Sequence, residues 1–186
     1  MPTLPEDTRR PEALAWSMAR WIGGEGFGTG PRAALRRMDL RDPDALAEPA
    51  LQCLLVQVLP VEWSGRDVMR DWALLAHLLA LSAPGLHVGG GSLGAALQAA
   101  GFSESRLLRL LGADRDTLTV LLPRACRFLA AKAQRLNPAE LIRLIRAASS
   151  HEPEVLERMR TEIARGYYRA QRDEVESSTH SQAETT

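Results

Sequence analysis

The sequence predicts an all-α protein of about eight or nine helices packed as two small helical bundles. Apolar residues recur at the helical i, i+3, i+4, i+7 spacing, no segment shows the alternation of a strand, and glycines and prolines divide the chain into pieces of helical length. The 186 residues are 45% apolar, enough for one core or for two small cores that share an interface.

The amino-terminal half, residues 1–84, contains four helical segments. The first has Pro11 in its opening turn. The last is apolar on most of its surface beyond Asp71, so we expect it at the centre of its bundle. It contains His77, which we interpret as a packed core residue, because no acid or nucleophile is spaced to work with it. The expected helices of this half cover residues 11–22, 31–38, 44–59 and 65–82.

The carboxy-terminal half, residues 85–172, is organised around two short helices separated by Gly101. The next segment contains Pro123, too deep for a first-turn proline, which predicts a kink or a restart of the helix. The acidic, Ser/Thr-rich residues 173–186 lack an apolar period, so we expect a disordered tail. The expected helices of this half cover residues 92–100, 103–111, 116–136, 138–148 and 154–172.

The charges of the chain cancel in total but not along its length. There are 23 cations and 23 anions, so net charge favours no class of partner. Between Gly101 and Ser150, however, nine cations meet only four anions, and Lys132 is the only lysine of the whole chain. Arginine suits phosphate recognition because its planar guanidinium can bind two oxygens at once. A GC-rich genome would also enrich arginine, and this alternative stays open.

The residue pattern does not indicate an enzyme, a cofactor or a metal site. The four histidines are scattered, no pair of them has metal-ligand spacing, and no nucleophile motif is present. The glycine-rich GGEGFGTG lacks the preceding strand and the following Lys-Ser or Lys-Thr of a phosphate loop. Cys53 and Cys126 lie in apolar helical contexts and predict buried thiols. With no signal peptide and no membrane span, the expectation is a soluble cytoplasmic protein.

The segment GGGSLGAALQAAGFSESRLLRLLGADRDTLTVLLPRACRFLA, followed by LNPAELIRLI, resembles the CasB family, the small subunit of the type I-E CRISPR surveillance complex Cascade. The earlier GPRAALRRMD is similar to a short arginine-bearing helix of that family, and the likeness extends from Thr29 to about Arg165. The resemblance implies a non-catalytic subunit that supports the guide RNA and the target strand and stabilises the displaced DNA strand of the R-loop. It also implies other Cascade subunits and a second copy of the chain as partners.

Nucleic-acid contacts are expected at arginines from several segments. The resemblance implies contacts at Arg36 or Arg37, and at Arg106, Arg115 and Arg124. The helical-face argument adds cations of the segments 116–136 and 138–148. Three cations of the former fall with Arg124 within roughly 140° of arc. These additions are Arg127, Lys132, Arg135 and Arg143. Arg115 carries an alternative, because the flanking Asp114 and Asp116 could make it a structural ion-pair partner instead.

Two other functions compete with this interpretation. SLGAALQAAGFSESRLLRLL has the small residues, the mid-turn glycine and the following serine cap of a helix-turn-helix regulator, with Arg106 and Arg109 available to a DNA groove. Its second helix is rich in leucine, however, which leaves little surface for reading bases. The third candidate is a helical protein-interaction scaffold whose arginines only solvate the surface, and it predicts no nucleic-acid binding at moderate salt.

Overall fold

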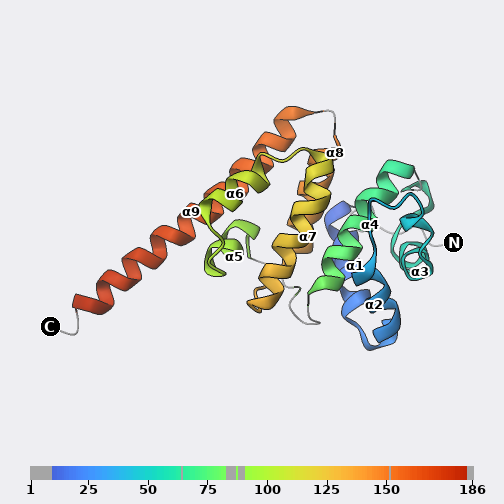
Figure 1. The fold of residues 1–186 in the computed structure, drawn as a ribbon, viewed down its shortest axis with the longest axis horizontal. Helices are drawn as coiled ribbons and strands as arrows, with labels where there is room; N and C mark the ends of the chain where they lie inside the picture. Colours follow the sequence, from blue (N-terminus) through green and yellow to red (C-terminus); the bar gives the residue numbers. More distant parts are fainter. Residues whose placement is uncertain (1–9, 64, 83–86, 88–90, 151, 184–186) are drawn as a thin grey trace.

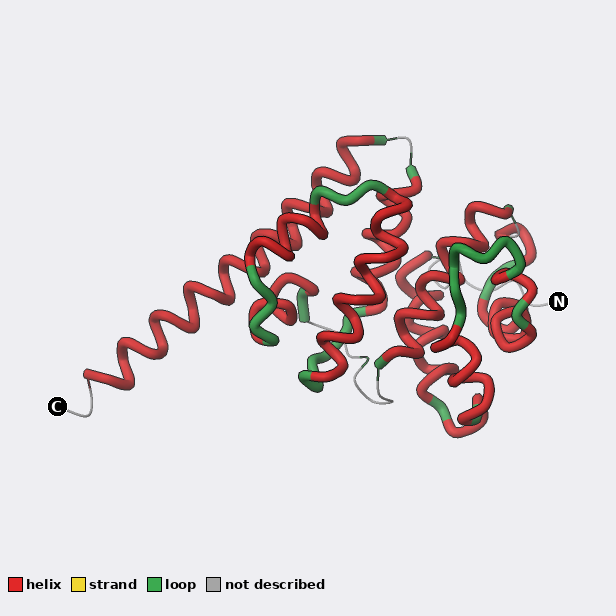
Figure 2. The backbone as a smooth tube through the Cα atoms, in the orientation of Figure 1, coloured by secondary structure: helices red, strands yellow, loops and turns green. Residues whose placement is uncertain are grey.

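The structure is a computed structural model that describes residues 10–63, 65–82, 87, 91–150 and 152–183. Within these residues it consists of nine α-helices and three short 3-10 helices, with no strand (Figure 2). His87 and Leu136 form an isolated β-bridge. The predicted all-α class is therefore confirmed.

The first four α-helices gather at one end of the molecule (Figure 1). Helix α4 is their centre, since every residue from Asp71 to Ala80 is buried and α1, α2 and α3 all pack against it. His77 lies in this run, and its Nδ1 donates to the carbonyl of Leu35 at 2.7 Å. Burial lowers the pKa of His77, which agrees with a neutral core residue. The helices are α1 (Pro11–Gly23), α2 (Thr29–Arg37), α3 (Pro49–Val58) and α4 (Arg66–Leu81).

The other five α-helices form the opposite end of the molecule (Figure 1). Helix α8 packs against α1 and α4 as well as against α7 and α9, so the buried residues of both ends form one continuous hydrophobic core. The division of the chain near residue 84 into two bundles stays a prediction. These helices are α5 (Leu93–Ala99), α6 (Glu104–Leu111), α7 (Arg115–Ala131), α8 (Pro138–Ser149) and α9 (Pro153–Ala183).

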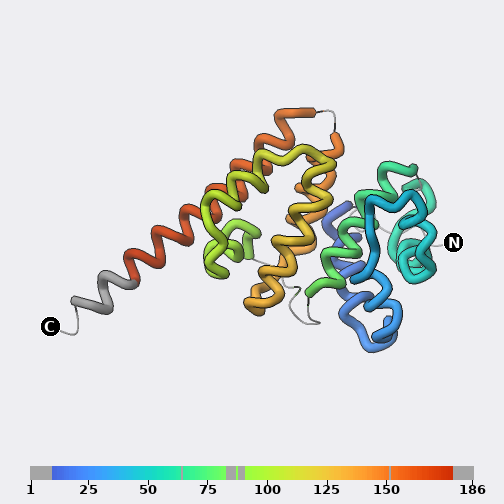
Figure 3. The backbone as a smooth tube through the Cα atoms, in the orientation of Figure 1, coloured from blue at the N-terminus to red at the C-terminus, as the bar shows by residue number. Residues whose placement is uncertain are grey.

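The carboxy-terminal part of α9 that is red in Figure 3 extends beyond the other helices. This helix continues from 173 to 183, where the sequence predicts a disordered tail, and residues 184–186 lie outside the described part. Side-chain contacts of residues 172, 174 and 176 stabilise the first part of this helical extension. Arg172 pairs with Glu176 at 3.6 Å, one helical turn away, and Gln98 donates from α5 to Glu174.

Helix α7 ends earlier than its apolar pattern predicts. Ala133 adopts a left-handed φ of 51°, and the amide of Gln134 reaches back to the carbonyl of Leu129 at 2.9 Å. This is a Schellman arrangement, which stops a helix by turning the backbone onto its last carbonyls. Lys132 and Arg135 consequently lie beyond the helix, and the helical-face argument that grouped them with the cations of α7 is wrong for these two residues.

Candidate nucleic-acid interface

Two adjoining cavities lie between the amino-terminal and carboxy-terminal helices. One, of about 350 Å³, lies between α4, α7, α8 and the segment after α2, and the other, of about 290 Å³, lies between that segment and α7. They share lining residues from both walls, among them Leu40 and Thr119, and together they form the α4–α7 groove. Its ionisable lining residues are Asp39, Arg41, Asp42, Arg70, Asp71, His77, Arg115, Asp116, Arg124 and Arg127.

One face of α7 supplies a wall of this groove. Thr119, Pro123 and Arg127 recur on it at the four-residue spacing of a helix, with Arg124 beside them. The helix continues through Pro123, so the predicted restart does not occur. Arg124 and Arg127 are exposed, one turn apart, and neither has an ion-pair partner among the residues that the structure describes. They are therefore available to an anionic ligand.

The opposite wall contributes two arginines that the sequence analysis missed. Arg41, in the segment after α2, binds both carboxylate oxygens of Asp39 at 3.0 Å, and this contact holds the pKa of Asp39 below its usual value. Arg70, on α4, is exposed and unpaired within the described part of the chain. Arg41 lies two residues after the GPRAALRRMD segment, and this proximity is a sequence signal that could have identified it. No local sequence pattern identifies Arg70 as a groove residue, because it lines the groove only through the packing of α4 against α7.

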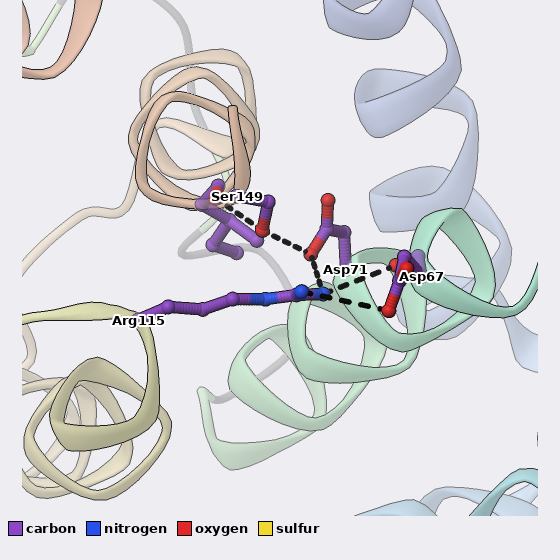
Figure 4. Close-up of polar contacts among 5 residues, drawn as sticks. Asp67, Asp71, Arg115 and Ser149 are labelled. Carbon is purple, nitrogen blue, oxygen red and sulfur yellow. Dashed lines mark hydrogen bonds and ion pairs between the residues drawn. The ribbon is translucent and has the colours of Figure 1, made fainter. Parts of the chain in front are cut away.

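Arg115 spans one end of the groove and is held by α4 (Figure 4). Its Nη2 lies 3.2 Å from Asp71 Oδ1, and its Nη1 lies 3.5 Å from Asp67 Oδ1. Ser149 Oγ of α8 donates to the same Asp71 oxygen at 2.6 Å. Burial raises the pKa of Asp71, and the contacts from Ser149 and Arg115 oppose that rise. This network, the Asp71 latch, joins α4, α7 and α8.

The structure thus assigns Arg115 a structural ion pair, with partners other than the flanking aspartates that the sequence suggested. Asp114 instead caps α7, since its Oδ1 accepts from the amide of Thr117 at 2.8 Å. The first residue of a helix points away from its cap, which leaves the guanidinium of Arg115 free to reach across to α4.

The remaining predicted cations lie outside the groove. Arg36 and Arg37 are exposed at the end of α2, just before the segment that enters the groove, and Arg36 donates to the carbonyl of Ala80. Arg106 is exposed on α6, which packs against α7 and α9 rather than α4. Arg143 pairs with Glu162 at 3.6 Å in a separate cavity between α8, α9 and the start of α1. Lys132 and Arg135 are exposed and line neither cavity of the groove.

The groove is only weakly positive. Its lining holds five arginines and four aspartates, and two of each are consumed by the pairs of Arg41 with Asp39 and of Arg115 with Asp71. No Phe, Tyr or Trp lines it, so bases have no aromatic surface on which to stack. Such a lining favours contacts to a phosphate backbone of modest strength and little sequence preference.

Among the described residues, no three His, Cys, Asp or Glu side chains gather as metal ligands would, and no helix in that part of the chain is long and apolar enough to cross a membrane. Cys126 is buried, as expected, and burial raises its pKa to about 12. Cys53 is exposed, contrary to the prediction of a buried thiol, because it lies on the outer face of α3 while its neighbours Leu51 and Leu54 face the core.

Comparisons with known proteins converge on one family. The family model of the CRISPR-associated protein Cse2 matches residues 31–168, a range that contains the whole α4–α7 groove. Among solved structures, the chain is similar to the crystal structure of CasB from Thermobifida fusca, with a TM-score of 0.58 and 15% sequence identity over 84% of this chain and 94% of that one. A search of curated proteins finds no match. At this identity the structural likeness shows the fold.

Proposed function

The chain belongs to the Cse2 family of CRISPR-associated proteins, which are subunits of the Cascade complex, and on this premise we propose that its α4–α7 groove binds the backbone of a single nucleic-acid strand within that complex. The role is non-catalytic. The chain supports the guide RNA and the target strand and stabilises the displaced DNA strand of the R-loop. Because R-loop formation exchanges duplexes of nearly equal stability, backbone contacts of modest strength are enough to favour it.

The observation that carries this proposal is the pair of exposed, unpaired guanidiniums of Arg124 and Arg127 on the groove face of α7. Arg41 lines the same cavity from the other wall, and Arg70 lines the adjoining cavity. Cavities of a few hundred Å³ admit the phosphates and sugars of one strand, whereas a duplex would rest on the rim. Arg36, Arg37, Arg106, Lys132 and Arg135 extend the proposed contact surface outside the groove, while Arg115 and Arg143 act through their ion pairs.

The double variant Arg124→Ala/Arg127→Ala tests the groove directly. In a reconstituted Cascade complex with guide RNA, we expect its affinity for target DNA to fall about a hundredfold or more, since each of the two charge-assisted contacts contributes about 1.5–3 kcal/mol. The slope of log K against log salt should become shallower by about 1.4, at roughly 0.7 per lost single-strand phosphate contact. Filter binding across a salt series measures both quantities.

Arg165→Ala/Arg169→Ala is the matched control, because these arginines lie one turn apart on the exposed surface of α9 and line neither cavity of the groove. It should leave affinity and salt slope unchanged. Equal losses of target-DNA affinity in both double variants would show that binding depends on the total charge of the chain and not on the groove. A chain that stays out of the complex and selects one palindromic duplex by itself would support the helix-turn-helix regulator instead.

A further inference from the structure

A second large hollow lies between the end of α1, α2 and α3, with a volume of about 810 Å³. Its lining is largely apolar and includes Trp21, Phe27, Leu54 and Val56. Trp21 is 44% exposed and Val56 is 77% exposed, so large apolar side chains meet water here. None of its lining residues belongs to the α4–α7 groove. An exposed apolar hollow of this kind on a soluble chain marks a surface that another molecule covers.

The lining chemistry is unsuited to nucleic acid. Glu48 is its one charged side chain, and no arginine or lysine lines the hollow. Arg32, the cation next to the lining residue Pro31, instead donates to the carbonyl of Ile22 at 2.6 and 2.9 Å. The Glu48 carboxylate caps α3 by accepting from the amide of Ala50 at 3.2 Å and pairs with no cation among the described residues, so its negative charge repels phosphate and attracts a basic side chain. The apolar walls, in turn, require an apolar occupant.

We propose that this hollow, the α1–α3 groove, is the docking site for an amphipathic helix of another protein subunit of Cascade, which places apolar side chains between Trp21 and Val56 and a lysine or arginine beside Glu48. The described part of the chain offers no strand edge for an added β-strand, and an apolar groove is the kind of surface into which an amphipathic helix lays its apolar face. Trp21 and Phe27 are aromatic side chains of the kind that dominates binding energy in interfaces. The inference rests on membership in a multisubunit complex and not on nucleic-acid binding.

Cys53 provides a direct probe, because it is exposed and lines the α1–α3 groove. The chain has two cysteines, and the other, Cys126, is buried, so a thiol reagent reaches only Cys53. We expect iodoacetamide to alkylate Cys53 in the isolated chain and at least tenfold more slowly in the chain assembled with the other Cascade subunits and guide RNA. Equal alkylation rates in the free and assembled chain would overturn the proposal.

Val56→Glu places a second carboxylate in the groove, and Val61→Glu is its matched control. Val61 is 88% exposed and does not line the hollow, so neither substitution disturbs the core. We expect Val56→Glu to weaken incorporation into Cascade at least about tenfold and Val61→Glu to leave it unchanged, with the affinity of both isolated variants for a single-stranded oligonucleotide equal to that of the wild type.

Incorporation of Val56→Glu at the wild-type level contradicts the proposal. So does an isolated wild-type chain that is dimeric in light scattering while Val56→Glu is monomeric, since a second copy would then occupy the groove. The variants also separate this inference from the nucleic-acid role: Arg124→Ala/Arg127→Ala should assemble and lose target affinity, whereas Val56→Glu should fail to assemble.

Discussion

Replacing Gly94 with alanine is expected to destabilise the protein by about 3 kcal/mol or more, the upper range for overpacking a core. Helix α5 lies directly against α9, and Gly94 faces it. A Cβ atom at this position would lie 1.9 Å from the carbonyl oxygen of Ile163 and 2.6 Å from the amide nitrogen of Tyr167. Both atoms belong to the backbone of α9, so no side chain can rotate away and the two helices must separate. Urea unfolding measures the loss.

Gly30→Ala is the control for this substitution. Gly30 lies in the first turn of α2, and a Cβ atom there would meet no other atom within 4 Å. Alanine at this position should leave stability unchanged or raise it by about 0.4–1 kcal/mol, because it restricts the unfolded chain. A Gly94→Ala variant as stable as Gly30→Ala would mean that α5 and α9 are farther apart than the structure has them.

Replacing Arg115 with leucine is expected to destabilise the protein by about 2 kcal/mol at neutral pH. The side chain of Asp71 is only 11% exposed, and without the guanidinium its charge is compensated by the hydroxyl of Ser149 and the more distant charge of Arg146. Removing one partner of a buried ion pair typically costs about 3–5 kcal/mol. We reduce this because Arg115 itself is 34% exposed and therefore partly solvated. Thermal or urea unfolding of Arg115→Leu and Arg115→Lys measures the effect, and the lysine variant should retain part of the stability.

The stability deficit of Arg115→Leu relative to wild type is expected to depend on pH through the ionisation of Asp71. Burial already raises the pKa of Asp71 in the folded protein, and loss of the cation should raise it further. A carboxyl whose pKa is higher in the folded than in the unfolded protein favours folding when it is protonated. This contribution to stability is fully present below the pKa of the unfolded state and is lost as pH rises through the pKa of the folded state. The deficit of Arg115→Leu relative to wild type should therefore shrink from pH 7 toward pH 4. A deficit that is constant over this range would show that Arg115 contributes packing rather than charge.

The Asp71 latch also bears on the proposed nucleic-acid role. It joins α4 to α7 and α8 at one end of the groove, so it sets the separation between Arg70 on one wall and Arg124 on the other. Loss of the latch should weaken strand binding without removing a phosphate contact. In Arg115→Leu we therefore expect reduced target affinity with a salt slope close to that of the wild type.

The sequence by itself determined the helical class, the approximate bounds of most helices, the core position of His77 and the resemblance to the family. These features follow from local patterns, because apolar spacing, caps and helix-breaking residues act within one or two turns of the chain. The same local reasoning extended α7 to residue 136, because no glycine marks the turn at Ala133.

Only the tertiary structure decided which charges act together. Arg115 bonds to Asp71, 44 residues away, rather than to its neighbours, and Arg41, Arg70 and Arg124 line one groove that no single segment contains. The need for glycine at position 94 likewise comes from the backbone of α9, which lies too close for a Cβ atom. The physical reason is that ion pairs, grooves and close helix contacts depend on distances between residues remote in sequence, and these distances exist only once the helices have packed.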